Sequence, residues 1–214
     1  MTLWQLFKTG GPTMYVLLLL SIISIAIILE RIIYYYLRSE VKRNVFMLDI
    51  SQELEKGNIK KALEISKNTD TPFSRVVQSA LILHGHNEVV ISNTMEREVI
   101  IQTTKLEKYT SIVGTIGGTA VYIGLFGTVL GIIRVFHDIS KSGSGGITVT
   151  IAGISEALVT TAAGLCVAVP AVMAYNYFTQ KIDSFISDME LSASEIMDLL
   201  NIKKLSARSI GNKS

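Results

Sequence analysis

Residues 153–178 read "GISEALVTTAAGLCVAVPAVMAYNYF", an apolar run in which Glu156 is the only charged side chain. A helix of about 20 apolar residues crosses the hydrocarbon core of a bilayer. A carboxylate near the middle of such a helix costs about 3 kcal/mol on insertion scales, and ionisable groups kept there usually belong to ion or substrate pathways. The run therefore predicts a transmembrane helix in which Glu156 has a function.

Two other parts of the chain are also long and apolar enough to span a membrane. Residues 9–29 and 109–133 contain no charged side chain, although the whole chain of 214 residues is 18% charged. The charges gather in residues 38–108 and in the tail after residue 180. This segregation predicts an all-α membrane protein, in which three transmembrane helices extend into a cytoplasmic helical domain. The net charge of +2 gives no support for nucleic-acid binding.

Basic residues near the ends of the spans predict the orientation of the chain. Residues 38–108 carry eleven Lys or Arg and the tail from 181 carries five, whereas Lys8 and Lys141 lie on the opposite side. Because cytoplasmic loops are enriched in Lys and Arg, we expect the N-terminus outside and the C-terminus in the cytoplasm. The expected segments are the N-terminal segment with the first transmembrane helix (1–37), the cytoplasmic helical domain (38–108), the second transmembrane helix (109–139), the outer turn (140–146), the third transmembrane helix (147–178), and the cytoplasmic C-terminal helix and tail (179–214).

Local signals predict several helices within the cytoplasmic segment. An apolar stripe that ends before Gly57 predicts one helix, with its buried face formed by Val41, Val45, Leu48, Ile50 and Leu54. Either Asp70 or Thr71 is expected to cap a later helix whose first turn contains Pro72. The stretch "HGHN" at 84–87 predicts a turn rather than a metal site, because no third ligand lies nearby in the sequence.

The segment after this turn contains no helix-breaking residue. Neither Pro nor Gly occurs between Glu88 and Gly114. One long helix is therefore expected to run from the cytoplasmic domain into the second span.

Small residues recur at helical spacing in the second and third spans. Such ladders let helix backbones approach closely within a membrane, where hydrophobicity does not drive helices together. We expect the two spans to pack tightly, within one subunit or between neighbours. The predicted packing residues are Gly117, Gly124, Gly127 and Gly131 in the second span, and Gly153, Ala157 and Gly164 in the third.

Polar side chains within these spans are candidates for an ion pathway. Glu156 and Thr160 are one helical turn apart, Thr161 lies beside them, and Thr128 reaches the depth of Thr161 if the two spans are antiparallel. A threonine in a membrane helix also commonly bonds its own backbone carbonyl. Glu156 has the alternative role of holding neighbouring helices by a salt bridge or hydrogen bond. Close pairing with Arg134, near the outer end of the second span, is not expected.

The two motifs "YIGLFGTVLGI" at 122–132 and "GISEALVTTAAGLCVAVPAVMAYNYF" at 153–178 resemble the MotA/TolQ/ExbB proton-channel family. The three spans and the "ERIIYY" sequence at 30–35 are similar to its TolQ/ExbB branch. The resemblance implies a homopentamer in a bacterial inner membrane, surrounding a dimer of a single-span ExbD/TolR-type protein. Together these proteins would convert the proton-motive force into mechanical work on the cell envelope, for outer-membrane transport or envelope integrity.

The resemblance also assigns roles to individual residues. Family pore positions correspond to Thr128, Glu156 and Thr161, while the titrating aspartate belongs to the partner. Two residues depart from the family pattern: Ala152 stands where proline is usual, and Thr160 stands where alanine is common. The Thr160 hydroxyl is expected to affect pore polarity or the choice between proton and sodium.

The residues leave two other functions open and argue against a third. A self-sufficient channel or transporter would use Glu156 to bind its own substrate, and a non-conducting membrane scaffold would use it only to hold helices. An enzyme is not expected, because the sequence offers no catalytic residue, metal cluster, cofactor-binding motif or phosphate loop.

Overall fold

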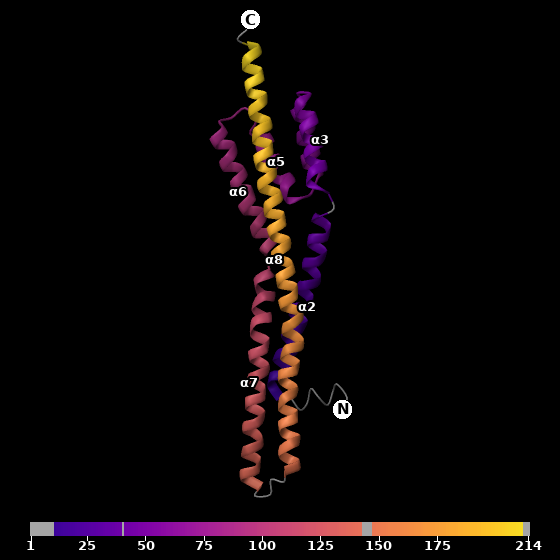
Figure 1. The fold of residues 1–214 in the computed structure, drawn as a ribbon, viewed down its shortest axis with the longest axis vertical. Helices are drawn as coiled ribbons and strands as arrows, with labels where there is room; N and C mark the ends of the chain where they lie inside the picture. Colours follow the sequence, from indigo (N-terminus) through magenta and orange to yellow (C-terminus); the bar gives the residue numbers. More distant parts are fainter. Residues whose placement is uncertain (1–10, 40, 143–146, 212–214) are drawn as a thin grey trace. The chain divides into compact units, whose positions relative to one another are not determined.

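The computed structural model describes residues 11–39, 41–142 and 147–211, and every element in those ranges is an α-helix (Figure 1). Three of the helices are long and apolar enough to cross a membrane: α2 (Gly11–Arg38), α7 (Thr110–Ser142) and α8 (Ile147–Gly211). The predicted all-α class and the three candidate spans are confirmed. Most of the predicted outer turn, and Lys8, lie outside the described residues.

The chain divides into two compact units. The first, the apolar unit, comprises Met1–Arg31 and Tyr109–Phe178. The second, the polar unit, comprises Ile32–Lys108 and Thr179–Ser214. Helices α2 and α8 each contribute residues to both units. This division follows the segregation of charge in the sequence.

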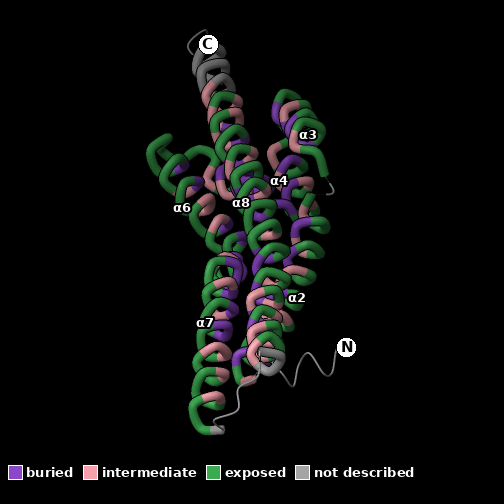
Figure 2. Tube along the Cα trace, turned by 60° about the horizontal axis from the view of Figure 1, so that its bottom comes forward, coloured by how far each residue is buried: buried purple, intermediate pink, exposed green. Residues whose placement is uncertain are grey.

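Apart from Leu17, the two buried clusters of the apolar unit consist of small and β-branched side chains. One buried cluster contains Leu17, Ala120 and Ala168, and another contains Val113, Ile116 and Ala171. Small residues at these contacts allow the backbones of α7 and α8 to approach each other. Large apolar residues of α2, among them Leu19, Ile22 and Ile33, instead remain exposed. Figure 2 colours the exposed residues along the backbone trace green. An apolar exterior of this kind suits a helix that faces lipid.

The polar unit contains four helices between its segments of α2 and α8. These are α3 (Arg43–Glu55), α4 (Ile59–Asn68), α5 (Pro72–Ile82) and α6 (Glu88–Glu107). The predicted breaks after α3 and α5 are confirmed at Gly57 and Gly85, whose φ angles of +80° and +91° favour glycine.

A capping box begins α5. The Thr71 hydroxyl accepts a hydrogen bond from Ser74 N at 3.3 Å, and the Ser74 hydroxyl accepts one from Thr71 N at 3.2 Å. Pro72 follows in the first turn, where its missing N–H leaves no bond unmade. Of the two residues that the sequence proposed as caps, the structure selects Thr71.

The predicted apolar face of α3 is wrong in its first half. The stripe residues Val41, Val45 and Leu48 are exposed, whereas Ile50 and Leu54 are buried. The helix begins only at Arg43, and its buried face starts with Phe46, whose ring centroid lies 5.3 Å from that of Phe73 in α5. Contact with an aromatic residue of another helix therefore sets the buried face of α3.

The prediction of one long helix from residue 88 into the second span is also wrong. Helix α6 ends at Glu107 and α7 begins at Thr110, because Tyr109 adopts a left-handed backbone conformation with φ +65°. That conformation costs roughly 1–2 kcal/mol for a residue other than glycine. Within the apolar unit, the guanidinium carbon of Arg31 lies 5.6 Å from the centroid of the Tyr109 ring. This cation–π contact holds the tyrosine in place.

The carbonyl at the end of α6 has its own partner. Within the polar unit, the fully buried Tyr35 hydroxyl donates a hydrogen bond to the Leu106 carbonyl at 2.8 Å. Carbonyls in the last turn of a helix have no partner within the helix. The Tyr35 hydroxyl therefore stabilises the C-terminus of α6, where the sequence contains no helix-breaking Pro or Gly.

Glu53 joins the end of α3 to the start of α4. Lys56 Nζ donates to Glu53 Oε1 at 2.9 Å, and Lys61 Nζ lies 3.6 Å from the same oxygen. The hydrogen bond from Lys56 is the main reason that the pKa of the Glu53 carboxyl lies below its ordinary value of 4.5. Burial opposes this shift, and the charges of Lys56 and Lys61 add to it. The ionised form of Glu53 therefore favours the folded state.

Replacing Glu53 with glutamine is expected to loosen the turn between α3 and α4 at pH 7. A carboxyl whose pKa is lowered by folding stabilises the folded state above its ordinary pKa, and this contribution disappears as the pH falls through the lowered value. Hydrogen exchange of the turn's backbone amides should be faster in Glu53→Gln than in the wild type at pH 7. The difference should shrink as the pH falls below 4.5 and vanish once the pH is below the lowered pKa of Glu53. The exposed neighbour supplies the control: Glu55→Gln should exchange like the wild type, and equal protection of all three proteins would contradict the argument.

Candidate functional site

Three threonine hydroxyls meet between α7 and α8 in the apolar unit. Thr128 Oγ1 of α7 is hydrogen-bonded to Thr161 Oγ1 of α8 and lies 3.4 Å from Thr160 Oγ1. Thr160 is only 1% exposed and Thr128 only 8% exposed. The bond to Thr161 confirms that Thr128 and Thr161 lie at the same depth, as the antiparallel arrangement predicts.

The same three hydroxyls surround two backbone carbonyls. The Gly124 carbonyl oxygen lies 3.2 Å, 3.1 Å and 3.3 Å from the hydroxyl oxygens of Thr128, Thr160 and Thr161 respectively. The Ala157 carbonyl lies 2.7 Å from the Thr160 hydroxyl and 3.3 Å from that of Thr128. Each hydroxyl has one proton to donate but more than one acceptor in reach. The network therefore has alternative hydrogen-bond patterns that differ only in where each O–H points.

Two glycines allow the helices to approach closely enough for this network. A Cβ built on Gly124 would lie 2.8 Å from the Thr160 carbonyl oxygen and 3.1 Å from Gly164 Cα. A Cβ on Gly164 would lie 2.7 Å from the Ala120 carbonyl oxygen and 3.0 Å from Gly124 Cα. Both contacts involve backbone atoms, which do not move aside as a flexible side chain does. The two backbones are in direct contact here.

The remaining small residues singled out by the sequence also lie between helices of the same chain. A Cβ on Gly127 would meet the hydroxyls of Thr13 in α2 and Thr160 in α8. The other glycines also face a residue of the opposite helix. A Cβ built on Gly117 would meet Val172, one on Gly131 would meet Ala157, and one on Gly153 would meet Val135. The packing ladder therefore joins α7 to α8 within one subunit and includes the first turn of α2.

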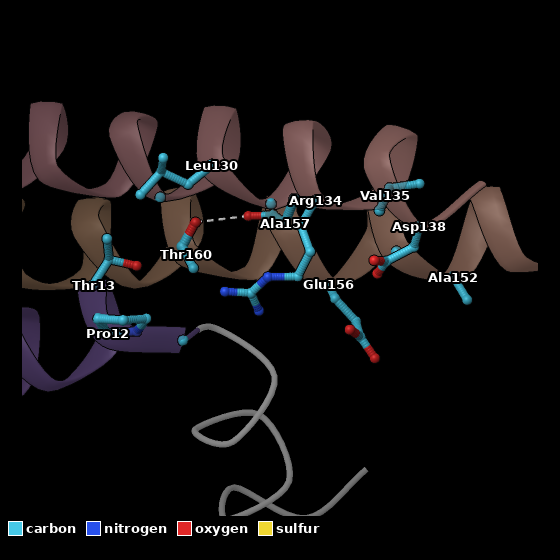
Figure 3. Close-up of a pocket in the computed structure, with 14 residues that line it drawn as sticks. Pro12, Thr13, Leu130, Arg134, Val135, Asp138, Ala152, Glu156, Ala157 and Thr160 are labelled. Atoms are coloured by element: carbon cyan, nitrogen blue, oxygen red, sulfur yellow. Dashed lines mark hydrogen bonds between the residues drawn. The ribbon is translucent and has the colours of Figure 1, made fainter. Parts of the chain in front are cut away.

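Glu156 lines a cavity of about 290 Å³ next to the hydroxyl network. Thr13 and Thr160 lie in its wall, together with Arg134 and Asp138 of α7 (Figure 3). Glu156 is half-buried, and among the described residues its carboxylate has neither a hydrogen-bond donor nor an ion-pair partner. Figure 3 shows the carboxylate and the Arg134 guanidinium pointing in different directions. Glu156 therefore stands beside the threonine network rather than within it.

Three polar residues of this cavity, Arg134, Asp138 and Thr13, have no role in the sequence-based prediction. The sequence identifies only Arg134 among them, as a charge within a span. Arg134 and Asp138 are one turn apart on α7, whereas Thr13 reaches the cavity through the first turn of α2. In that turn, Gly11 has a φ of +65° and its built Cβ would lie 3.8 Å from the Arg134 guanidinium. The uncommon charge of Arg134 within a span was the available signal.

The fold and the site define a helical membrane protein with three candidate spans and a polar network between two of them. Residues 64–191 match the sequence profile of the MotA/TolQ/ExbB proton channel family. Because this match covers more than half of the chain, the protein belongs to that family.

Individual relatives point to the ExbB branch. The biopolymer transport protein ExbB of Neisseria meningitidis is 30% identical over 226 aligned residues, which cover 95% of this chain and 99% of the relative. The ExbB protein of Pseudomonas putida is 33% identical over 72% of this chain. The alignment covers 49% of the Pseudomonas protein, so the chain spans about half of that relative's length. An ExbB protein of Xanthomonas campestris is 35% identical over 59% of this chain and 56% of its own.

Proposed function

We propose that this protein is the multi-span subunit of an ion-driven motor in a bacterial inner membrane, with its N-terminus outside and its C-terminus in the cytoplasm. It works with a single-span ExbD/TolR-type partner and converts the proton-motive force into mechanical work on the cell envelope. The observation that carries the proposal is the network of Thr128, Thr160 and Thr161 beside the carboxylate of Glu156, which pairs with none of the described residues. The subunit is not an enzyme and does not bind nucleic acid.

The chemistry of the network suits an ion path. The three hydroxyls and two carbonyls provide oxygens that accept a hydrogen bond from a protonated carboxyl, and the three hydroxyls can also donate one to an ionised carboxylate. A carboxyl on the partner's helix would form and exchange hydrogen bonds with these groups while it gains and loses a proton. Movement of one charge through 100 mV yields about 2.3 kcal/mol, so a few ions suffice to drive a step of several kcal/mol. Glu156 adjusts the electrostatics of this path.

The proposed assembly has five copies of this chain around a dimer of the partner. An isolated copy leaves large apolar side chains exposed on α7, including Tyr122, Leu125 and Phe126. These side chains are available to neighbouring copies, to the partner and to membrane lipid. The copy number itself follows from the family, and mass measurement of the intact complex tests it.

Ion flux into vesicles tests the proposed division of labour between the subunits. The purified chain alone is expected to conduct no more protons than protein-free vesicles under a potassium diffusion potential, because it lacks the titrating acid. The complex co-purified with its single-span partner should conduct protons, as read from a pH-sensitive dye inside the vesicles. A sodium-sensitive dye in the same experiment decides which ion moves.

Each other result of the flux experiment favours an alternative. Robust flux through the chain alone would replace the motor by a self-sufficient channel or transporter. The absence of both flux and a co-purifying partner would favour a membrane scaffold, in which Glu156 only holds helices together.

A further inference from the structure

A second cavity, of about 350 Å³, lies within the polar unit and is rich in cations. Arg38 at the end of α2, Lys42 and Arg43 at the start of α3, and Lys181 of α8 line it. Among the described residues, Asp188 contributes the only carboxylate of its wall. Four basic side chains with one described carboxylate are an unusual lining for a structural void, since like charges repel.

Local carboxylates neutralise only part of this charge. Arg43 has close partners, because its guanidinium lies 2.8 Å from Glu195 and 4.0 Å from Asp188. Arg38 lies 3.8 Å from Asp70, but that exposed carboxylate is nearer to Arg75, at 3.1 Å. Asp70 therefore neutralises the charge of Arg38 only weakly. The two lysines of the pocket add further positive charge.

The two lysines have no acidic partner in the described part of the chain. Lys181 donates a hydrogen bond to the neutral Ser39 hydroxyl at 3.1 Å. Lys42 has neither an ion pair nor a side-chain hydrogen bond there. Together with Arg38, these lysines leave a cationic pocket that an anion with several oxygens would satisfy.

The wall of the pocket is apolar as well as basic. Lys181 Nζ lies 5.4 Å from the centroid of the Phe185 ring, and Phe73 and Val45 also line the cavity. Along α2, Tyr36 and Leu37 immediately precede Arg38, and both are exposed. An anion with an attached apolar group fits this surface better than a free inorganic ion, because it also covers apolar area.

The pocket occurs where the chain leaves its apolar segments. Arg38 is the first charged residue after Arg31 along α2, and Lys181 is the first after Glu156 along α8. Basic side chains at such positions lie near the headgroups of the cytoplasmic leaflet, which carry negative charge. The position in the sequence therefore brings anionic headgroups within reach of the pocket.

The geometry points to a binding site for the phosphodiester headgroup of an anionic phospholipid of the phosphatidylglycerol type. Lys42, Lys181 and Arg38 contact the phosphate oxygens, while the exposed Val45 and the exposed end of α2 contact the glycerol and the upper acyl chains. The lipid ties the ends of α2, α3 and α8 to the membrane surface. This site is independent of the proposed ion path.

Native mass spectrometry of the full chain, with equal amounts of phosphatidylglycerol and phosphatidylcholine of the same acyl chains, tests the site. We expect retention of phosphatidylglycerol by the wild type. The double variant Lys42→Gln/Lys181→Gln should bind it about 30-fold more weakly, since each lysine near an anionic lipid surface contributes roughly fivefold. The matched control Lys60→Gln/Lys67→Gln removes two exposed lysines of α4 and should bind like the wild type. The charge-conserving variant Lys42→Arg/Lys181→Arg should retain most of the binding.

The remaining outcomes overturn the proposal in distinguishable ways. Equal retention of the two lipids, or equal losses in the pocket and control variants, would show that the pocket does not select an anionic headgroup. Saturable binding of inorganic phosphate that displaces phosphatidylglycerol would assign the pocket to a soluble anion. A lower oligomer mass of Lys42→Gln/Lys181→Gln, with unchanged lipid content per chain, would make the pocket a contact between subunits. Circular dichroism of each variant checks that its helices are intact.

Discussion

Replacing Gly124 with valine is expected to prevent α7 from packing against α8 and to unfold the apolar unit in mild detergent. The new Cβ would lie 2.8 Å from the Thr160 carbonyl oxygen and 3.1 Å from the Cα atoms of Thr161 and Gly164. Overpacking a core costs about 1–3 kcal/mol when side chains adjust. We expect a loss at or above the upper end of that range, because the opposing atoms here belong to the backbone. A thermal melt followed by size-exclusion chromatography measures it.

The same helix offers a matched control. Gly118 lies less than two turns away, is exposed, and has no atom within 4 Å of its built Cβ. Gly118→Val should therefore melt close to the wild-type temperature, although it makes the same substitution in the same span. Equal damage from both substitutions would mean that valine is harmful anywhere in α7. In that case the close approach of Gly124 to Gly164 would not explain the loss.

Features that depend on local sequence were predictable from the chain. The three spans follow from the number of consecutive apolar residues, which no tertiary contact needs to supply. The start of α5 follows from Thr71 and Pro72, because a capping box forms within four residues. The shared depth of Thr128 and Thr161 follows from counting turns along two antiparallel helices.

Features that depend on distant residues were not predictable. At the break, the Tyr109 ring contacts the Arg31 side chain, which lies far away in the sequence. At the end of α6, the Leu106 carbonyl accepts a hydrogen bond from the Tyr35 hydroxyl, 71 residues away. The buried face of α3 turns toward Phe73 of α5, so its own periodicity gave the wrong face in the first half. The cavity around Glu156 was not predictable for the same reason. Its wall combines residues of α2, α7 and α8, and their meeting depends on the packing of all three helices.

Glu156→Gln is expected to abolish ion-driven activity while leaving the fold and the oligomer intact. Glutamine has nearly the same shape but carries no charge, and no described residue donates a hydrogen bond to the wild-type carboxylate. The substitution therefore breaks no hydrogen bond or ion pair among the described residues, and removal of a charge from a membrane helix is favourable. Thermal stability of the complex should be equal to or higher than that of the wild type. Proton flux through the reconstituted complex should fall to the background of protein-free vesicles.

Asp138→Asn is the matched control for this experiment, because Asp138 is an exposed carboxylate that lines the same cavity. Its flux should stay near the wild-type value if the carboxylate of Glu156 acts at its particular place beside the threonine network. An equal loss of flux in Asp138→Asn would show that the net charge of the cavity matters rather than the position of Glu156. Dissociation or a lower melting temperature in Glu156→Gln would show that the carboxylate holds helices together. The scaffold role would then replace the ion path.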